Sequence, residues 1–275
     1  MTLRRLAVTL CSLLMGCVLT SGPCEAAEDL VLKLYQESGT QMAMRQLPAG
    51  FNAYLAQQTD VPPVVTRAFQ TAIHETLDSN RTDSTFLARL GPALNEPTTK
   101  AALAFLKSKT GRTVTEAERF ASTPEGAIAM QKFLSDAPPE IDPARADLLR
   151  VLDTATRSTE ISTYQALAIA HGILLAFDEA RPEGERLGSD AIWAEVKKGE
   201  AQVMFNARQE TLLYFQYTYR AVTKEELREY LEFAISEHGE EYHRVFLRVY
   251  ALALADIIQP FAKVVARELM ASSGR

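Results

Sequence analysis

The stretch YHRVFLRVYALALADIIQPFAKVVAR, residues 242–267, decides the fold class of this chain. Its apolar residues recur at steps of three and four: Phe246, Val249, Ala253, Ile257, Phe261 and Val264. This spacing places them on one face of an α-helix, whose period is 3.6 residues. The basic residues of the stretch fall largely on other faces. The pattern therefore predicts a long amphipathic helix with one buried stripe.

The rest of the chain also carries helical signals. Apolar and polar residues never alternate for more than a few positions, and no Asn-Gly or Asp-Gly hairpin turn occurs. Helix-start signals are frequent: Thr223 and Glu226 form a capping box, and Asn95 precedes Glu96 and Pro97. We predict an all-α fold, a multi-helix bundle.

An internal repeat suggests that the bundle has two related halves. ALNEPTTKAALAFLKSKTG, residues 93–111, aligns without a gap on AVTKEELREYLEFAISEHG, residues 221–239. The segment DAPPEIDP, residues 136–143, lies between them, and its prolines cannot continue a helix. We predict a signal peptide over residues 1–26 and two helical units, residues 27–137 and 144–275, joined by a Pro-rich linker over residues 138–143.

The repeat contains the pattern Phe-x-x-Ser-x-x-Gly. It occurs as Phe105, Ser108 and Gly111, as Phe233, Ser236 and Gly239, and with Thr as Phe120, Thr123 and Gly126. We expect Phe to pack in the last turn of one helix, Ser or Thr to cap the next, and Gly to let another backbone come close. A catalytic serine is the alternative, but neither serine lies in a nucleophile elbow or near an evident base.

The run YTYRAVTKEELREYLEFAISEHGEEYHR, residues 217–244, resembles the signature of an exported bacterial family known only as domain of unknown function number twenty fifty-nine. The resemblance rests on a capped Thr-x-x-Glu-Leu helix that leads into Phe, Ser and Gly, here Thr223, Glu226, Leu227, Phe233, Ser236 and Gly239. Ala234, Ile235 and Glu237 depart from the more usual Phe-Tyr-x-Ser-Pro pattern, and the first half matches more loosely. The resemblance implies an all-helical exported protein and transfers no catalytic residue.

The first 26 residues have the layout of a secretory signal peptide. Arg4 and Arg5 precede an apolar run of about 15 residues, which is shorter than the roughly 20 needed to span a bilayer, and small residues follow. We expect cleavage after Ala26 and a periplasmic or secreted protein without a transmembrane helix in the mature chain. The longest remaining apolar run that we identify is Ala166 to Phe177.

A lipoprotein is the alternative interpretation of the leader. Leu14-Met15-Gly16-Cys17 resembles a lipoprotein box, in which Cys17 becomes the lipidated first residue. Met15 is unusual at its position, and the apolar residues after Cys17 suit a continuing signal sequence better than a tether.

Composition excludes several classes of function. The chain has 275 residues, with 29 Lys and Arg against 35 Asp and Glu, and this acidic balance gives no drive towards nucleic acid. All three cysteines, Cys11, Cys17 and Cys24, lie in the leader, so the body has no thiolate metal site and no cysteine nucleophile. We expect no cofactor.

The histidines offer one route to an enzyme. His238 and His243 are five residues apart, whereas a zinc helix needs a spacing of four, and Glu240 with His243 would be only half of a di-iron site. His171 lies in the apolar stretch ALAIAHGILLAF, where a hydrogen-bonded core histidine is the simpler interpretation. A metal-dependent or acid/base hydrolase centred on His171, or on His238 and His243, is our alternative hypothesis.

Aromatic residues crowd one segment and suggest a binding surface. Tyr214 and Phe215 cannot share one narrow helix face with Tyr217 and Tyr219, so part of this set, with Tyr214, Tyr217 and Tyr219 as candidates, is a possible surface for a partner or lines a groove between helices. Large core fillers are the alternative interpretation. We expect a non-enzymatic, exported helical protein that binds a protein or an envelope component, and its specific role is not set by the sequence.

Overall fold

A computed structural model describes residues 23–49, 51–52, 61–136 and 142–273 of the chain. Within these ranges every regular element is helical and no strand occurs, which confirms the all-α prediction. Most of the expected signal peptide and residues 138–141 of the expected linker lie outside the described residues.

The helices occur along the chain in the following order. They are α1 (Pro23–Glu37), α2 (Thr40–Arg45), α4 (Pro63–Thr76), α5 (Ser79–Leu90), α6 (Glu96–Lys107), α7 (Lys109–Ala121), α8 (Pro124–Ser135), α9 (Pro143–Thr156), α10 (Ser158–Glu179), the 3-10 turn η1 (Glu183–Glu185), α11 (Ser189–Lys197), α12 (Glu200–Thr218), α13 (Lys224–Ala234) and α14 (Glu237–Ser273).

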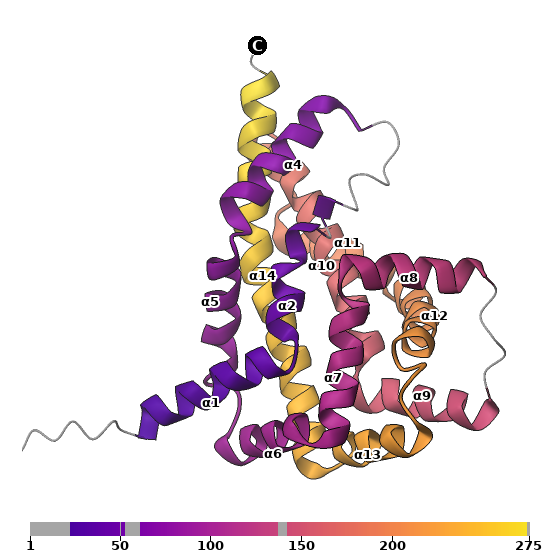
Figure 1. Ribbon diagram of the computed structural model, residues 1–275. Helices are drawn as coiled ribbons and strands as arrows, with labels where there is room; N and C mark the ends of the chain where they lie inside the picture. The colour runs from indigo at the N-terminus through magenta and orange to yellow at the C-terminus, as the bar shows by residue number, and fades with distance from the viewer. Residues whose placement is uncertain (1–22, 50, 53–60, 137–141, 274–275) are drawn as a thin grey trace, which may run out of the picture.

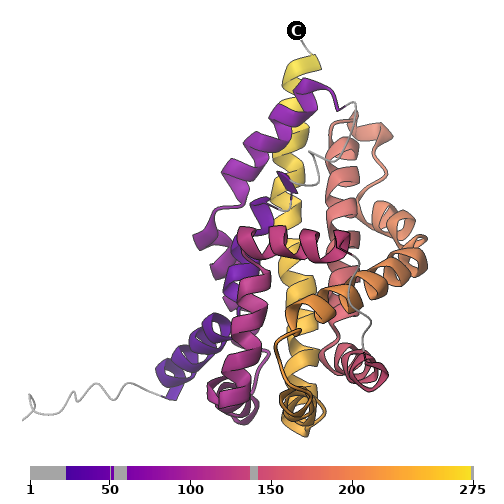
Figure 2. The ribbon, with the colours of Figure 1, turned by 45° about the vertical axis from the view of Figure 1, so that its right-hand side comes forward.

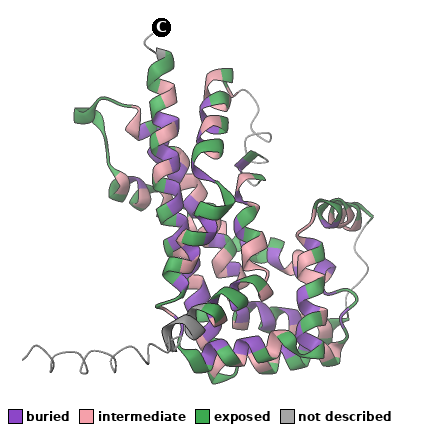
Figure 3. Cartoon of the chain, turned by 60° about the vertical axis from the view of Figure 1, so that its left-hand side comes forward, coloured by how far each residue is buried: buried purple, intermediate pink, exposed green. Residues whose placement is uncertain are grey.

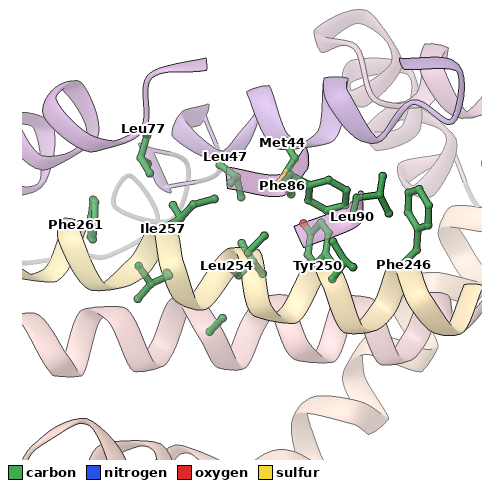
Figure 4. Close-up of a cluster of buried hydrophobic side chains, with 14 of the residues drawn as sticks. Met44, Leu47, Leu77, Phe86, Leu90, Phe246, Tyr250, Leu254, Ile257 and Phe261 are labelled. Carbon is green, nitrogen blue, oxygen red and sulfur yellow. The ribbon is translucent and has the colours of Figure 1, made fainter. Parts of the chain in front are cut away.

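Helix α14 is the central element of the fold. It has 37 residues, about 55 Å at 1.5 Å per residue, and runs the length of the molecule (Figures 1 and 2). Helices α4, α5 and α6 pack against it from the first part of the chain, and α10 packs against it from the second. Figure 4 shows side chains of the two parts, such as Met44, Phe86, Tyr250 and Phe261, meeting along this helix.

The buried stripe expected on this helix is present. Phe246, Val249, Ala253, Ile257 and Phe261 are buried, and Val264 is partly buried. The basic residues of the stretch are exposed. The buried face is wider than the expected stripe because α10 covers a further row, in which Ile258 lies against Gly172.

Helix α14 is also long and apolar enough to cross a membrane, judged by its length and composition. The longest apolar run identified from the sequence, Ala166 to Phe177, lies in α10 and not in this helix. More than half of its most apolar window is buried inside the protein, as in core helices in general, which pass the same test.

Two clusters of apolar side chains form the interior. Figure 3 shows that buried positions occur along most of the helices and that exposed positions lie on their outer faces. The first surrounds α14 and draws residues from both sides of the expected linker, from Val31 to Val265, so the two predicted units share this core. The second joins α7, α9, α12 and α13, through residues such as Val114, Leu149 and Leu227.

Three corners with the same geometry connect α6 to α7, α7 to α8, and α13 to α14. At each corner the hydroxyl of Ser108, Thr123 or Ser236 accepts a hydrogen bond from the N–H of the glycine three residues later, over 2.9–3.1 Å. A Cβ atom on any of these glycines would collide with the carbonyl group of the preceding Phe of the pattern. The glycine is therefore needed because two backbone turns touch there. The relation between the two halves beyond these corners stays a prediction.

Candidate functional site

A cavity of about 680 Å³ lies where the two apolar clusters meet. Phe246 and Tyr250 of the first cluster and Phe215, Tyr219 and Tyr230 of the second line it. Its other walls come from the α1–α2 turn and from α2, α7, α8, α10 and α12. Most of its surface is apolar. Its size lies within the range of small-molecule sites, roughly 300–1,000 Å³.

The corners determine which side chains of α7 face this cavity. The helix starts at the Ser108 cap and ends at the Thr123 corner, so both of its ends are fixed. Thr115, Glu118 and Arg119 follow one another at helical steps of three and four and line the cavity.

Glu118 is the acidic group inside the cavity wall. Its Oε1 accepts a hydrogen bond of 2.6 Å from the hydroxyl of Tyr219. Burial raises the pKa of the Glu118 carboxyl to about 7, against a smaller lowering by the Tyr219 hydrogen bond and by the charge of Arg119. This carboxyl group can therefore gain or lose a proton near neutral pH.

Several tyrosines surround this carboxylate. Burial is the largest cause of the raised pKa of Tyr219 and of Tyr230, and the negative charge of Glu118 is the second. Burial raises the pKa of Tyr214 as well, with a smaller contribution from Glu118. These hydroxyls therefore stay protonated and can donate hydrogen bonds within the cavity.

The cation next to Glu118 in the sequence is held elsewhere. The guanidinium of Arg119 donates to the carbonyl oxygens of Gln36 and Glu37 over 3.2 and 3.1 Å, and lies 3.8 Å from the Glu37 carboxylate. Among the described residues no cationic side chain forms an ion pair with Glu118. The acidic residues Glu118 and Glu210 thus outnumber the single cation of the cavity lining.

The expected partner surface of Tyr214, Tyr217 and Tyr219 needs correction. Tyr217 is 1 % exposed and Tyr219 is 2 % exposed, so neither lies on a surface. The Tyr217 hydroxyl donates to the carbonyl oxygen of Gly126 over 2.9 Å, which gives it a buried partner. Tyr214 and Tyr219 line the cavity instead, because the chain turns at the end of α12 and carries these rings towards α7 and α8.

His238 and His243 have different surroundings. His238 Nδ1 lies 3.2 Å from the hydroxyl of Thr98 on α6. His243 is buried beside the rings of Phe233 and Tyr242, and its Nε2 has no hydrogen-bond partner among the residues that the structure describes. Burial, followed by the charge of Arg157, lowers the pKa of His243 to about 4. His243 is therefore a neutral core residue at physiological pH.

His171 has a serine neighbour that the sequence did not indicate. Its Nε2 lies 3.2 Å from both the hydroxyl and the carbonyl oxygen of Ser189, and its ring meets the edge of Trp193. A catalytic pair of this kind needs an acid on the other ring nitrogen. Within the described ranges no carboxylate bonds to His171, so the contact explains how α10 holds the start of α11.

The metal-dependent alternative gains no support from the geometry. In the part of the chain that the structure describes, no group of three or more His, Cys, Asp or Glu side chains could hold a metal ion. Sequence reasoning predicted neither the cavity nor Glu118, which lies in the ordinary helical run TEAER. Only the crowding of aromatic residues before Arg220 pointed to this region.

No family model, curated protein or solved structure matches the chain. The resemblance of residues 217–244 to an exported family stays a prediction that rests on those residues.

Proposed function

We propose that this chain is an exported, non-enzymatic binding protein, and that the cavity between α7, α10 and α12 holds a small apolar component of the cell envelope. The observation that carries the proposal is the unfilled space of about 680 Å³ with mostly apolar walls. The space is partly open to solvent, as exposed Glu210 in its lining shows. A concave, mostly apolar site of this size is typical of small-molecule binding sites.

The position of the cavity supports entry of a small molecule. Leu213 and Glu210 on α12 belong to its lining and are exposed, so the cavity reaches the protein surface beside this helix. Ala207 and Thr211, four residues apart on the same helix, are buried lining residues. Helix α12 therefore contributes both buried and solvent-exposed side chains to the cavity, and a ligand can enter past the exposed ones.

Export is the second part of the proposal. The layout of residues 1–26 and the family resemblance of residues 217–244 both favour it. A periplasmic or secreted protein meets lipid-like molecules, for which an apolar cavity is a suitable site. Mass spectrometry of the exported chain tests this part, since a start at Ala27 without lipid supports cleavage and a diacylated Cys17 supports the lipoprotein alternative.

Titration with the neutral fluorescent probe N-phenyl-1-naphthylamine tests the cavity. We expect saturable binding to the wild type. Ala207→Trp and Ser162→Trp should weaken it about tenfold or more, because an indole ring would occupy the cavity from α12 or from α10. Ser162 is exposed, so this second variant keeps the fold intact if Ala207→Trp does not.

The matched control is Ala194→Trp on the exposed face of α11, outside the cavity lining. This variant should bind the probe like the wild type. The proposal is overturned if the wild type shows no saturable binding. It is also overturned if all three variants bind the probe as tightly as the wild type does.

A further inference from the structure

The cavity contains one feature that a purely apolar ligand would not need. The Glu118 carboxyl is partly buried in its wall with the Tyr219 hydroxyl as its hydrogen-bond donor, and among the described residues no cationic side chain forms an ion pair with it. Burying an ionised carboxylate without a counter-ion is unfavourable. A ligand that brings a positive charge to this position would remove that penalty.

The neighbouring cation does not supply the charge. Arg119 is anchored to the end of α1 by two backbone carbonyl groups and by Glu37. Moving its guanidinium to Glu118 would leave these carbonyl groups without their donor. The arrangement therefore keeps the space beside Glu118 open.

The aromatic lining favours the same type of ligand. Tyr214, Phe215, Tyr219, Tyr230 and Tyr250 all line the cavity, and the face of an aromatic ring attracts an organic cation. A fatty acid or another anion would meet Glu118 and Glu210, which carry the same charge as the ligand.

We propose that the ligand is an amphiphilic organic cation, with an apolar body in the cavity and one positively charged nitrogen beside Glu118. This inference rests on the proposed function, because it names the chemical class of the ligand for the same cavity. Glu118 acts as the counter-ion, Tyr219 orients its carboxylate, and the apolar walls bind the body of the ligand.

The raised pKa of Glu118 gives this inference a pH dependence. A cation binds more tightly to the ionised carboxylate, and the ionised fraction increases from pH 5.5 to pH 8. Affinity for a permanent cation should therefore increase about tenfold over this range. Among the described residues, two other charged groups line the cavity. Glu210 on α12 is exposed to solvent, and Arg119 stays charged over this whole pH range. Helix α10 contributes no charged side chain to the lining.

The test compares two probes with the same chain, dodecyltrimethylammonium and 1-dodecanol. Each probe is titrated against N-phenyl-1-naphthylamine bound to the wild type or to Glu118→Gln, and the displacement of the dye gives the affinity of the probe. All concentrations stay below those at which micelles form. We expect the wild type to prefer the cation about tenfold or more. Glu118→Gln should lose this preference and its pH dependence while it still binds dodecanol. Glu116→Gln is the matched control and should keep the preference, since Glu116 lies on the same helix but is exposed and outside the cavity lining.

The outcomes separate the two proposals. If dodecanol binds and the cation binds no better, or if Glu118→Gln keeps the preference, the inference about ligand class is wrong and the cavity remains a binding site. If neither probe displaces the dye, both proposals fail. Should Glu118→Gln not fold, the pH series of the wild type decides, because an affinity for the cation that is constant from pH 5.5 to pH 8 overturns the inference.

Discussion

The rings of Phe105 and Phe233 stack face to face, with 4.3 Å between their centroids and 3° between their planes. These are the two positions that the internal repeat aligns, one at the end of α6 and the other at the end of α13. The corner between α6 and α7 therefore meets the corner between α13 and α14 through the same residue of the pattern. The Phe of the third corner, Phe120, is 43 % exposed, and in the described part of the chain no aromatic ring stacks on it in this way.

The first prediction concerns the glycine of the last corner. Gly239→Ala should destabilise the protein by about 3 kcal/mol or more, because the new Cβ collides with the backbone carbonyl of Phe233 and neither helix can move freely. Urea denaturation measures the change. Gly184→Ala is the control, since a Cβ there meets no atom within 4 Å and the stability should stay within about 0.5 kcal/mol of the wild type. Equal effects of the two substitutions would contradict the role assigned to the corner.

The second prediction follows from the pKa of Glu118. Between its ordinary value of 4.5 and about 7, the folded protein holds a proton that the unfolded chain has already released. The contribution of Glu118 to stability therefore falls as the pH rises through this window. Glu118→Gln removes this titration. The free energy of unfolding of the variant should therefore increase, relative to that of the wild type, by up to about 3 kcal/mol as the pH rises from 4.5 to 8. Urea denaturation at both pH values measures this gain, and a stability difference independent of pH would show that Glu118 titrates normally.

The third prediction concerns His243, whose pKa is lowered from 6.5 to about 4 by burial and by Arg157. Between these values the unfolded chain binds a proton that the folded protein does not. Stability is therefore lost as the pH falls from 6.5 to 4. His243→Leu should reduce this loss by about 3 kcal/mol, as measured by denaturation across the range. Parallel pH profiles of the variant and the wild type would speak against a neutral buried imidazole.

The fourth prediction uses the buried hydroxyl of Tyr217. Tyr217→Phe leaves the carbonyl group of Gly126 without this donor and should destabilise the protein by about 1–2 kcal/mol. Tyr164→Phe is the control, because the Tyr164 ring packs on Trp193 and its hydroxyl has no hydrogen-bond partner among the described residues. Thermal unfolding of both variants measures the difference, and a loss at Tyr164 as large as that at Tyr217 would rule out the hydrogen bond as its cause.

Local features of the fold could be predicted from the sequence because they depend on neighbours along the chain. The apolar residues of α14 recur with the helical period, and the caps of Asn95, Ser108 and Thr223 lie three residues before the groups they bind. Each of these interactions is complete within one or two helical turns.

The cavity could not be predicted in this way. It depends on the distances between α7, α10 and α12, and these distances are set by how the helices pack around α14. Glu118 has the sequence surroundings of an ordinary surface residue, and only the fold brings Tyr219 to it from 101 positions away. The same long-range packing explains the error at Tyr217, whose hydroxyl bonds to a backbone group 91 positions earlier in the chain. Aromatic crowding indicated the region but not the direction of the side chains.

The central place of α14 has a consequence for the order in which the protein is made. The helices α4, α5, α6 and α10 all precede the element against which they pack. During synthesis their apolar faces remain uncovered until the residues of α14 have emerged, and contacts between such distant segments form slowly. The core around α14 therefore cannot be completed until the last part of the chain has been made.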